Sequence, residues 1–340
     1  MSPRNGLDAV VLGGGGFGTT LAHLLAEQGR RVLLWVRREE AAREIGRSHR
    51  CERYLPGFRL SARLRATTDL AGAVRQAPVV LVAVPSRSMR DVARLLGDTV
   101  EGDQIVVHAT KGIEIGTGLR MSEILRRETC ALKIGALSGP NLSHEIMAGK
   151  PAGAVIASRF EEVTRAVQGL FAGTRFRVYA GADVIGAEIG GAFKNIVALA
   201  AGAADGMDLG ANAKALMVTR GLAEMQRYGT ALGADPMTFQ GLAGIGDLMA
   251  TCFSPLSRNR SLGERLARGE SVQAALAGLT QVAEAVPTCL AVYQQAVQMG
   301  LDLHVVQAVH GVLYEGVTPA EALRELTARP AGREGTGAAR

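Results

Sequence analysis

The stretch Gly13-Gly14-Gly15-Gly16-Phe17-Gly18 decides the fold, because it fits the pattern G-x-G-x-x-G. It follows an apolar run, Ala9–Leu12, and opens a helical pattern, Phe17–Gln28, that Gly29 closes. In such a unit the first glycine permits a tight turn, the second lets a pyrophosphate approach the backbone, and the third lets helix pack on strand. Free N–H groups and the helix dipole then hold the phosphates. The stretch predicts a dinucleotide site, with candidate cofactor residues Gly13, Gly15, Gly16, Phe17 and Gly18.

Apolar runs and helical stretches alternate through the first half of the chain. Strands are expected at Arg31–Val36, Val79–Val84, Ile105–Ala109, Ile134–Leu137 and Ala154–Ala157. Such runs, separated by helices, are typical of a parallel sheet that helices cover on both faces. We therefore predict an α/β, Rossmann-like N-terminal domain with a mostly parallel, doubly wound sheet over residues 1–182.

The pattern changes after Asp183, where Ala- and Leu-rich segments with helical spacing replace the strand-like runs. These segments are Val184–Ala204, Ala211–Tyr228 and Val272–Ala277. We predict an all-α C-terminal domain over residues 183–328, followed by a disordered tail over residues 329–340 that is rich in Gly, Ala and Arg.

Composition narrows the class of protein. The 340 residues, 47% of them hydrophobic, suffice for two cores. The net charge is +6, and the basic residues form no run of five. This distribution favours an anionic small molecule over nucleic acid as the ligand. An Arg-rich proteome explains the charge equally well. Four dispersed cysteines and six dispersed histidines suggest neither a disulfide framework nor a metal site. Without a long apolar run or a signal peptide, we expect a cytoplasmic protein with no membrane span.

Arg37 and Arg38 stand at the end of the second expected strand, where a dinucleotide site meets the adenosine ribose. An NAD-specific site usually has Asp or Glu there, whereas two arginines suit the 2′-phosphate of NADP. The alternative is a pair of solvated surface charges, since Glu39 and Glu40 follow directly. We expect NADP to be favoured over NAD.

Polar residues follow three more of the expected strands, in Val84-Pro85-Ser86, His108–Gly112 and Ser138-Gly139-Pro140-Asn141. Open α/β sheets keep their ligand sites at such strand ends. Lys111 could hold an anion there, or it could be an ordinary loop lysine.

Lys194 and Asn195 interrupt a helix of small apolar residues, in a chain with only five lysines. One interpretation is a lysine that extends to the surface. The other is a partly desolvated lysine in a cleft, whose lowered pKa suits proton transfer. Asp247 supplies a carboxylate on a glycine-rich turn, and the segment Ser257–Arg260 could bind a phosphate through an arginine fork and helix N–H groups.

These motifs together resemble the bacterial NAD(P)-dependent glycerol-3-phosphate dehydrogenase family. The matching segments run in order to about residue 325 and are VLGGGGFGTTLA, VAVPS, ATKGIE, SGPN, FRVY, GGAFKNIVALAAG, DGMDLGANAKALMVTRGLAEM, GLAGIGDLMATC, SRNR and QVAEAVPT. The resemblance implies that Lys194 is the catalytic residue. It implies cofactor positions at Gly16, Phe17, Arg37, Lys111, Ser143, Arg258, Val282 and Glu284. It implies substrate positions at Lys111, Gly139, Asn141, Lys194, Asp247, Ser257, Arg258 and Asn259.

Three residues depart from what the family usually has. Gly16 stands where Ser is frequent, Asn141 replaces a Ser or Thr, and Ser143 replaces an Ala. Each departure removes, replaces or adds a side-chain hydroxyl, while ligand contacts made by the backbone would be retained.

The resemblance implies reversible reduction of dihydroxyacetone phosphate to sn-glycerol 3-phosphate by NADPH or NADH, with Lys194 as general acid and base. The product would feed glycerophospholipid synthesis. Two other functions stay open on the residues: a 6-phosphogluconate- or hydroxyacid-type dehydrogenase, and a sensor that binds NAD(P)H without chemistry. The expected partner is a small molecule, and a homodimer is the candidate assembly.

Overall fold

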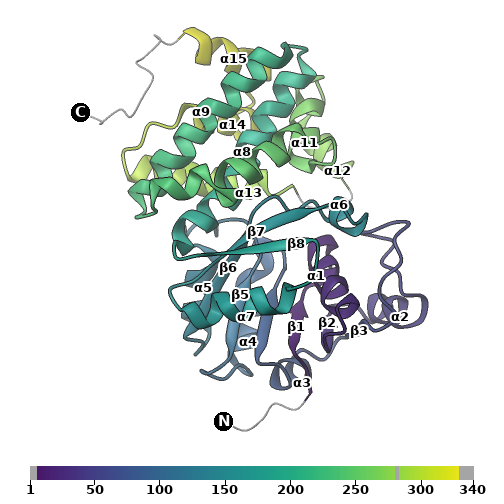
Figure 1. Ribbon diagram of the computed structural model, residues 1–340. Helices are drawn as coiled ribbons and strands as arrows, with labels where there is room; N and C mark the ends of the chain where they lie inside the picture. The colour runs from purple at the N-terminus through teal and green to yellow at the C-terminus, as the bar shows by residue number, and fades with distance from the viewer. Residues whose placement is uncertain (1–5, 280–282, 329–340) are drawn as a thin grey trace.

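The computed structural model describes residues 6–279 and 283–328 and shows two packed parts. In Figure 1 an α/β part lies below and a helical part lies above it. The chain runs through the sheet first and then stays in the helical part.

One eight-stranded sheet forms the α/β part, in the order β3-β2-β1-β4-β5-β6-β7-β8. Neighbours from β3 to β6 run parallel, β7 is antiparallel to β6, and β8 is parallel to β7. The strands are β1 Ala9–Leu12, β2 Val32–Trp35, β3 Arg65–Thr67, β4 Val79–Val82, β5 Ile105–His108, β6 Lys133–Ser138, β7 Ala152–Ala157 and β8 Phe176–Gly181. The predicted mostly parallel, doubly wound sheet is confirmed.

Helices cover both faces of this sheet, because its strands are apolar on both sides. Helices α1, α2 and α7 bury Leu25, Ile45 and Val167 on one face, and α3, α4 and α5 cover the other. The helices of this part are α1 Gly16–Glu27, α2 Glu39–Ser48, α3 Leu70–Arg75, η1 Ser86–Ser88, α4 Met89–Gly97, α5 Met121–Glu128, α6 Ser143–Met147 and α7 Glu161–Phe171.

The strands predicted from apolar runs are all present, with ends that differ by at most two residues. Strands β3 and β8 were not predicted. β3 has only three residues and no apolar run, and β8 is an edge strand with exposed positions, so neither has the pattern of a buried strand.

The helical part contains no strand among the described residues, which confirms the all-α prediction. Its elements are α8 Val184–Gly206, α9 Gly210–Ala231, η2 Pro236–Gln240, the π-helical turn η3 Leu242–Gly246, α10 Asp247–Phe253, α11 Arg258–Ala267, α12 Val272–Ala277, α13 Ala285–Gln298, α14 His304–Tyr314 and α15 Pro319–Ala328. The tail predicted for residues 329–340 lies outside the described residues.

Helix α8 is the centre of the helical part and also touches the sheet. Phe193 and Ile196 are fully buried in the helical core, whereas Ala187, two turns earlier, packs against Ala157 of β7. Among the described residues, α8 is the one helix long and apolar enough to cross a membrane, but 83% of its apolar window is buried inside the protein. Its apolarity is therefore accounted for by core packing.

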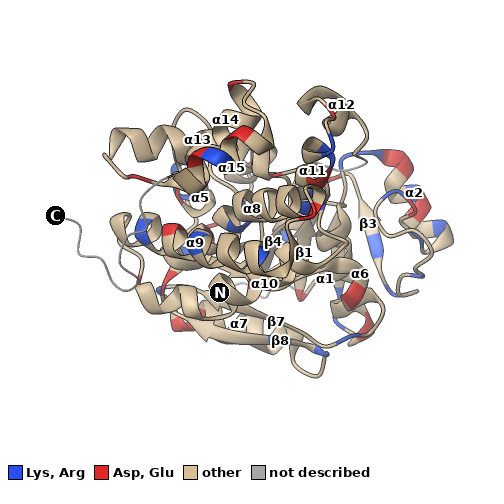
Figure 2. Ribbon diagram, turned by 90° about the horizontal axis from the view of Figure 1, so that it is seen from above, with Lys and Arg blue, Asp and Glu red and all other residues tan. Residues whose placement is uncertain are grey.

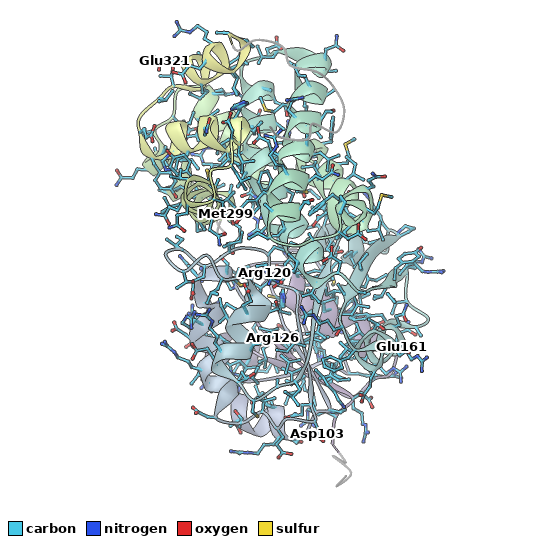
Figure 3. The ribbon with its side chains drawn as sticks, turned by 90° about the vertical axis from the view of Figure 1, so that its left-hand side faces the viewer. Asp103, Arg120, Arg126, Glu161, Met299 and Glu321 are labelled. Carbon is cyan, nitrogen blue, oxygen red and sulfur yellow. The ribbon has the colours of Figure 1, made fainter. Side chains whose placement is uncertain are left out.

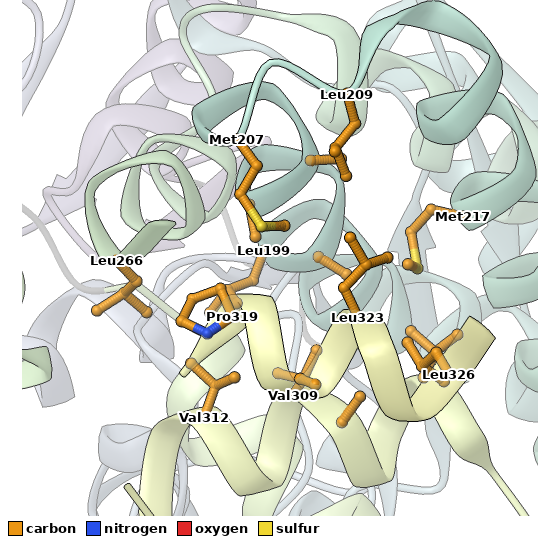
Figure 4. A pocket seen from close by; sticks show the side chains of 16 residues that line it. Leu199, Met207, Leu209, Met217, Leu266, Val309, Val312, Pro319, Leu323 and Leu326 are labelled. Carbon is orange, nitrogen blue, oxygen red and sulfur yellow. The ribbon is translucent and has the colours of Figure 1, made fainter. Parts of the chain in front are cut away.

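A pocket lined entirely by apolar residues lies in the helical part, between α8, α9, α14 and α15 (Figure 4). Leu199, Met217, Val309 and Leu323 face one another across it. No lining residue carries a charge or an acid–base group, so the chemistry has to be sought elsewhere.

Candidate active site

The glycine-rich loop between β1 and α1 is shaped by close approaches of the backbone. Gly13 has φ +123, a conformation that side chains disfavour, and a Cβ on Gly18 would stand 2.0 Å from the Gly13 carbonyl oxygen. At Gly15, in contrast, a Cβ would meet nothing within 4 Å, and no side chain caps the first turn of α1. The loop thus leaves open space where helix N–H groups can receive a pyrophosphate.

Two of the departures from the family pattern face each other at this loop. A Cβ on Gly16 would stand 3.6 Å from the Ser143 hydroxyl oxygen and 3.7 Å from the Tyr54 carbonyl oxygen. Ser143 therefore presents a hydroxyl close to where a serine at position 16 would carry one. Phe17, beside it, packs edge-on against Phe176 with 6.4 Å between ring centroids.

Arg37 and Arg38 lie immediately after β2 and are exposed, and Arg38 occupies the N-cap position of α2. Glu39 and Glu40 form the first turn of that helix. The two guanidinium groups are thus free to approach a ligand at the end of β2, where the adenosine ribose of a dinucleotide lies in this type of fold.

Three charged groups meet where α8, α10 and the loop after β5 come together. Lys194 of α8 donates to Oδ1 of Asp247, and Lys111 donates to Oδ2 of the same carboxylate at 2.6 Å. Lys111 also donates to the Gly139 carbonyl at 2.9 Å. Lys194 is 7% exposed and Asp247 1% exposed, so these two residues of the cluster are buried inside the protein and do not lie on its surface.

When both lysines are protonated, the charges of this cluster do not balance, since two ammonium groups share one buried carboxylate. Burial lowers the pKa of Lys194 below the 10.5 of a free lysine; Asp247 raises it and Lys111 lowers it. A buried lysine with a lowered pKa can exchange a proton near neutral pH. An anion, or the partly negative oxygen of a reacting carbonyl, would complete the charge balance.

Local structure explains why Asp247 points at the lysines. It is the first residue of α10 and follows the π-helical turn η3, and Thr251 donates to its carbonyl oxygen at 2.6 Å. Helix α8 lies directly against η3, because a Cβ on Gly190 would stand 2.1 Å from the Ala243 carbonyl oxygen. Single π-helical turns occur frequently at functional sites.

The end of β6 carries buried polar groups that have no partner among residues 6–279 and 283–328. Within these ranges, neither side-chain polar atom of Asn141 has a hydrogen-bond partner, nor has the Ser138 hydroxyl. Gly139, between them, has φ +142 and a Cβ there would stand 2.9 Å from the Gly153 carbonyl oxygen. Because buried polar groups are normally paired, the Asn141 amide has the bonding capacity that a ligand would use.

The start of α11 holds the predicted phosphate-binding segment. Ser257 is the N-cap, and its hydroxyl accepts from the N–H of Arg260. Desolvation lowers the pKa of the Arg258 guanidinium, and the nearby Glu284 raises it. Arg260 forms an ion pair with Asp205 at 2.6 Å, which makes it a structural residue, not a candidate ligand.

Asn259 is buried and joins three helices. Its amide nitrogen donates to Asn195 of α8 at 2.8 Å, and its oxygen accepts from the N–H of Ala285 in α13 at 3.1 Å. Glu284, the residue before Ala285, accepts from the N–H of Ser86 at 3.2 Å and from its hydroxyl at 2.5 Å. Val282, the remaining predicted cofactor position, lies outside the described residues.

Comparison with known proteins supports a single family. The chain matches the N-terminal model of NAD-dependent glycerol-3-phosphate dehydrogenase over residues 8–164 and the C-terminal model over residues 183–324. It is 43% identical over 316 residues to glycerol-3-phosphate dehydrogenase [NAD(P)+] of Acinetobacter baylyi, which covers 93% of this chain and 88% of that protein. It is 44% identical to the protein of that name from Streptomyces griseus, over 95% of this chain and 97% of that protein.

The chain belongs to the NAD-dependent glycerol-3-phosphate dehydrogenase family. A crystal structure of glycerol-3-phosphate dehydrogenase from Coxiella burnetii superposes with a TM-score of 0.92 at 33% identity, covering 96% of this chain and 100% of that chain. The similarity to the family therefore extends over both parts of the fold.

Sequence reasoning missed some residues of this glycerol-3-phosphate dehydrogenase family member that support the fold around the site. Glu188 is one: it is 6% exposed on α8 and accepts from Arg120 and Ser122. It is a lone acid in the apolar run that contains Lys194, so the argument applied to Lys194 could have found it. Thr251 gave no such signal, because an isolated hydroxyl residue is common everywhere. Ser86 was noted only as a polar residue at a strand end, and its partner Glu284 was not foreseen.

Proposed function

We propose that the protein catalyses the reversible reduction of dihydroxyacetone phosphate to sn-glycerol 3-phosphate, with Lys194 as general acid and base. The observation that carries the proposal is the pair of lysines on the buried Asp247, in a protein that also has a dinucleotide-type loop and an arginine at the start of α11. That arrangement provides a proton donor and an anion-binding group on one side of a nucleotide site.

Each side chain has a task in this proposal. Lys194 donates the proton to the oxygen of the ketone as it becomes an alkoxide, and Asp247 keeps the lysine oriented and its proton available. Lys111 adds positive charge beside that oxygen, which stabilises negative charge that develops in the transition state. Arg258 and the N–H groups at the start of α11 bind the phosphate dianion.

The nucleotide loop fits a dinucleotide, because Gly15 leaves room and the first turn of α1 has no side-chain cap. When bound, NADPH or NADH supplies the hydride for the ketone carbon. The protein contributes position and charge: the loop holds the phosphates, and burial of Lys194 keeps water away from the reacting oxygen.

The activity is tested with purified protein by following the loss of NADPH absorbance with dihydroxyacetone phosphate. Parallel reactions use a hydroxyacid's keto form and, in the oxidative direction, 6-phosphogluconate with NADP. Turnover limited to dihydroxyacetone phosphate supports the proposal. Preference for another substrate would replace it, and NADPH binding without any turnover would favour a sensor.

We also propose NADP as the favoured cofactor, because Arg37 and Arg38 are exposed at the end of β2. Replacing both with Ser should raise KM for NADPH several-fold more than KM for NADH, since one hydrogen bond to a charged group contributes about 1.5–3 kcal/mol. Equal losses for both cofactors would mean that the arginines do not read the 2′-phosphate.

The remaining parts of the proposal concern the cell. The protein would act in the cytoplasm on small molecules, its product would feed glycerophospholipid synthesis, and its candidate assembly is a homodimer. Sedimentation of the purified chain tests the assembly, and fractionation of the source cells tests the location.

A further inference from the structure

Two serines of the α/β part are held in the same way by two glutamates of the helical part. Ser86, at the start of η1, donates its N–H and its hydroxyl to the carboxylate of Glu284. Ser122, in the first turn of α5, donates its N–H at 2.7 Å and its hydroxyl at 2.8 Å to the carboxylate of Glu188. The two parts of the protein therefore meet through two matched serine–glutamate clamps.

The two clamps differ in what surrounds them. The Glu188 side chain is 2% exposed, and its carboxylate also lies 2.6 Å from Arg120 and 3.0 Å from His108. Figure 3 shows Arg120 at the junction between the two parts, with the helical layer above it. Electrostatic interactions with His108 and Arg120 help hold the pKa of Glu188 below its usual range despite burial, so this clamp is a fixed joint.

Among the described residues, the Glu284 carboxylate accepts hydrogen bonds from Ser86 alone. Burial raises its pKa, and the hydrogen bonds from Ser86 counteract this effect, followed by the charges of Arg258 and Arg87. Ser86 also contacts the loop that carries Lys111, because a Cβ on Gly112 would stand 2.5 Å from the Ser86 Cβ. This clamp thus lies close to Arg258 and to the loop that carries Lys111, two of the basic residues of the proposed site.

A chain of contacts leads from the second clamp to the proposed acid. Glu284 precedes Ala285, whose N–H donates to the Asn259 oxygen; the N–H can only donate, so it fixes the orientation of that amide. The Asn259 nitrogen then donates to Asn195, the neighbour of Lys194 on α8. The position of Glu284 is thereby linked to the turn of α8 that carries Lys194.

We infer that Ser86 is a positioning residue: by holding Glu284 it sets the start of α13, and through Asn259 and Asn195 the placement of Lys194 and Arg258 against the cofactor. The Ser122–Glu188 clamp only joins the two parts. This inference rests on the function proposed above, and it assigns to Glu284 a bond within the protein in addition to the cofactor contact implied by the family.

The test compares Ser86→Ala with Ser122→Ala, which removes the equivalent hydroxyl from the other clamp. NADPH binding is followed through the fluorescence of Trp35, the single tryptophan of the chain, located at the end of β2. Thermal unfolding and the turnover of dihydroxyacetone phosphate are measured on the same preparations. Ser86→Thr keeps the hydroxyl, and Glu284→Gln keeps the size of the acceptor.

Ser86→Ala should lower kcat about tenfold and weaken NADPH binding several-fold, the effect of one lost hydrogen bond to a charged group, while its Tm stays close to that of the parent. Ser86→Thr should restore turnover, and Ser86→Ala should cost little more in the Glu284→Gln background. Ser122→Ala should lower Tm and leave kcat unchanged.

The inference is overturned if Ser86→Ala lowers only Tm, as Ser122→Ala does, or if its effect adds fully to that of Glu284→Gln. If the parent protein binds NADPH but does not reduce dihydroxyacetone phosphate, the proposed function fails by itself. The NADPH affinities of the two serine variants then still decide whether Ser86 positions the site.

Discussion

Lys194 and Glu188 are the two charged side chains that α8 carries into the interior of the protein. They lie almost two turns apart and take opposite tasks. Glu188 receives an arginine, a histidine and a serine and joins the two parts, whereas Lys194 meets a carboxylate that it shares with a second lysine. We interpret the fully paired carboxylate of Glu188 as a structural group. The ammonium group of Lys194, which shares its carboxylate with another lysine, is available for chemistry.

Replacing Lys194 by Arg should abolish turnover and leave NADPH binding intact. Arg keeps the positive charge but does not release a proton at neutral pH, and general acid catalysis contributes about 10²–10⁴-fold. In the parent, burial lowers the pKa of Lys194, so the rate of ketone reduction should decline as rising pH removes its proton, at a pH below 10.5. Initial rates across pH, with Trp35 fluorescence for binding, provide the measurement.

Lys194→Ala serves as the companion variant and should also lose some substrate affinity. Near-parental turnover of the Arg variant, with an unaltered pH profile, would reduce Lys194 to an electrostatic role. If both variants failed to fold, Lys194 would be a structural residue.

The hydroxyl of Ser143 should replace the one that Gly16 lacks. Ser143→Ala is expected to weaken NADPH binding several-fold, because a hydroxyl bonded to a phosphate is removed from the nucleotide loop. Gly16→Ser combined with Ser143→Ala should recover most of the affinity, since the new hydroxyl stands close to the lost one. Binding titrations of the three proteins measure this. No recovery in the double variant would show that the two positions are not equivalent.

Much of the site could be proposed from the sequence, because its residues violate the pattern around them. A lysine in an apolar helix and two arginines at a strand end are visible without coordinates. The partners could not be predicted in the same way: Ser86 meets Glu284 across 198 residues, and no local pattern encodes that contact.

At the scale of elements, the close packing of α8 on η3 places Asp247 within reach of both lysines. Gly190→Ala should destabilise the protein by about 1–3 kcal/mol or more, because the new Cβ would meet the Ala243 carbonyl oxygen at 2.1 Å and the backbone has to shift. The shift would move Asp247 away from Lys194 and lower kcat. Chemical denaturation and initial rates test both effects.

Gly46→Ala on α2 is the control, because a Cβ there meets nothing within 4 Å. It should be neutral or slightly stabilising, since Ala favours a helix interior. A fully active and equally stable Gly190→Ala variant would contradict the close approach of α8 to η3.

The elements with strong patterns were predicted and the weak ones were not. Val79–Val82 and Ile105–His108 are buried apolar runs, and Val272–Ala277 was predicted at its observed ends. The reversal of β7 relative to β6 could not be predicted, because strand direction depends on the path of the chain between them. That path contains only the five-residue helix α6.

For the whole molecule, the positive charge is concentrated on one side. The segment from Arg30 to Arg65 contains 11 arginines and four glutamates, a net charge of +7, while the whole chain carries +6. Figure 2 shows the resulting blue segments around α2 and β3. The basic residues form no long run in sequence; many of them lie on α2, on β3 and on the segments beside them, next to β2, after which the adenosine side of a dinucleotide is expected.

This distribution should accelerate the binding of the more highly charged cofactor. Arg43→Gln combined with Arg47→Gln, on the exposed side of α2, should lower the association rate of NADPH more than that of NADH at low salt. The difference should disappear near 1 M salt, where the Debye length is about 3 Å. Stopped-flow fluorescence of Trp35 measures both rates.

Arg126→Gln with Arg324→Gln removes the same charge from α5 and α15 and should leave both rates unchanged. If both double variants lowered the association rate of NADPH equally, the net charge of the protein, and not the position of the arginines, would explain the faster binding.

We propose a domain boundary between residues 182 and 183, but α8, which begins there, belongs to both cores. The helix has 23 residues and is about 34 Å long; its first turns cover Ala157 on the sheet, and the rest fills the helical part. A gene divided at that boundary would yield one polypeptide with an uncovered sheet face and another whose leading helix had lost its support. The two parts can be assigned to separate domains, but neither would be stable without the other. Recombination between relatives could therefore exchange one part only where the residues that contact α8 on both sides still match.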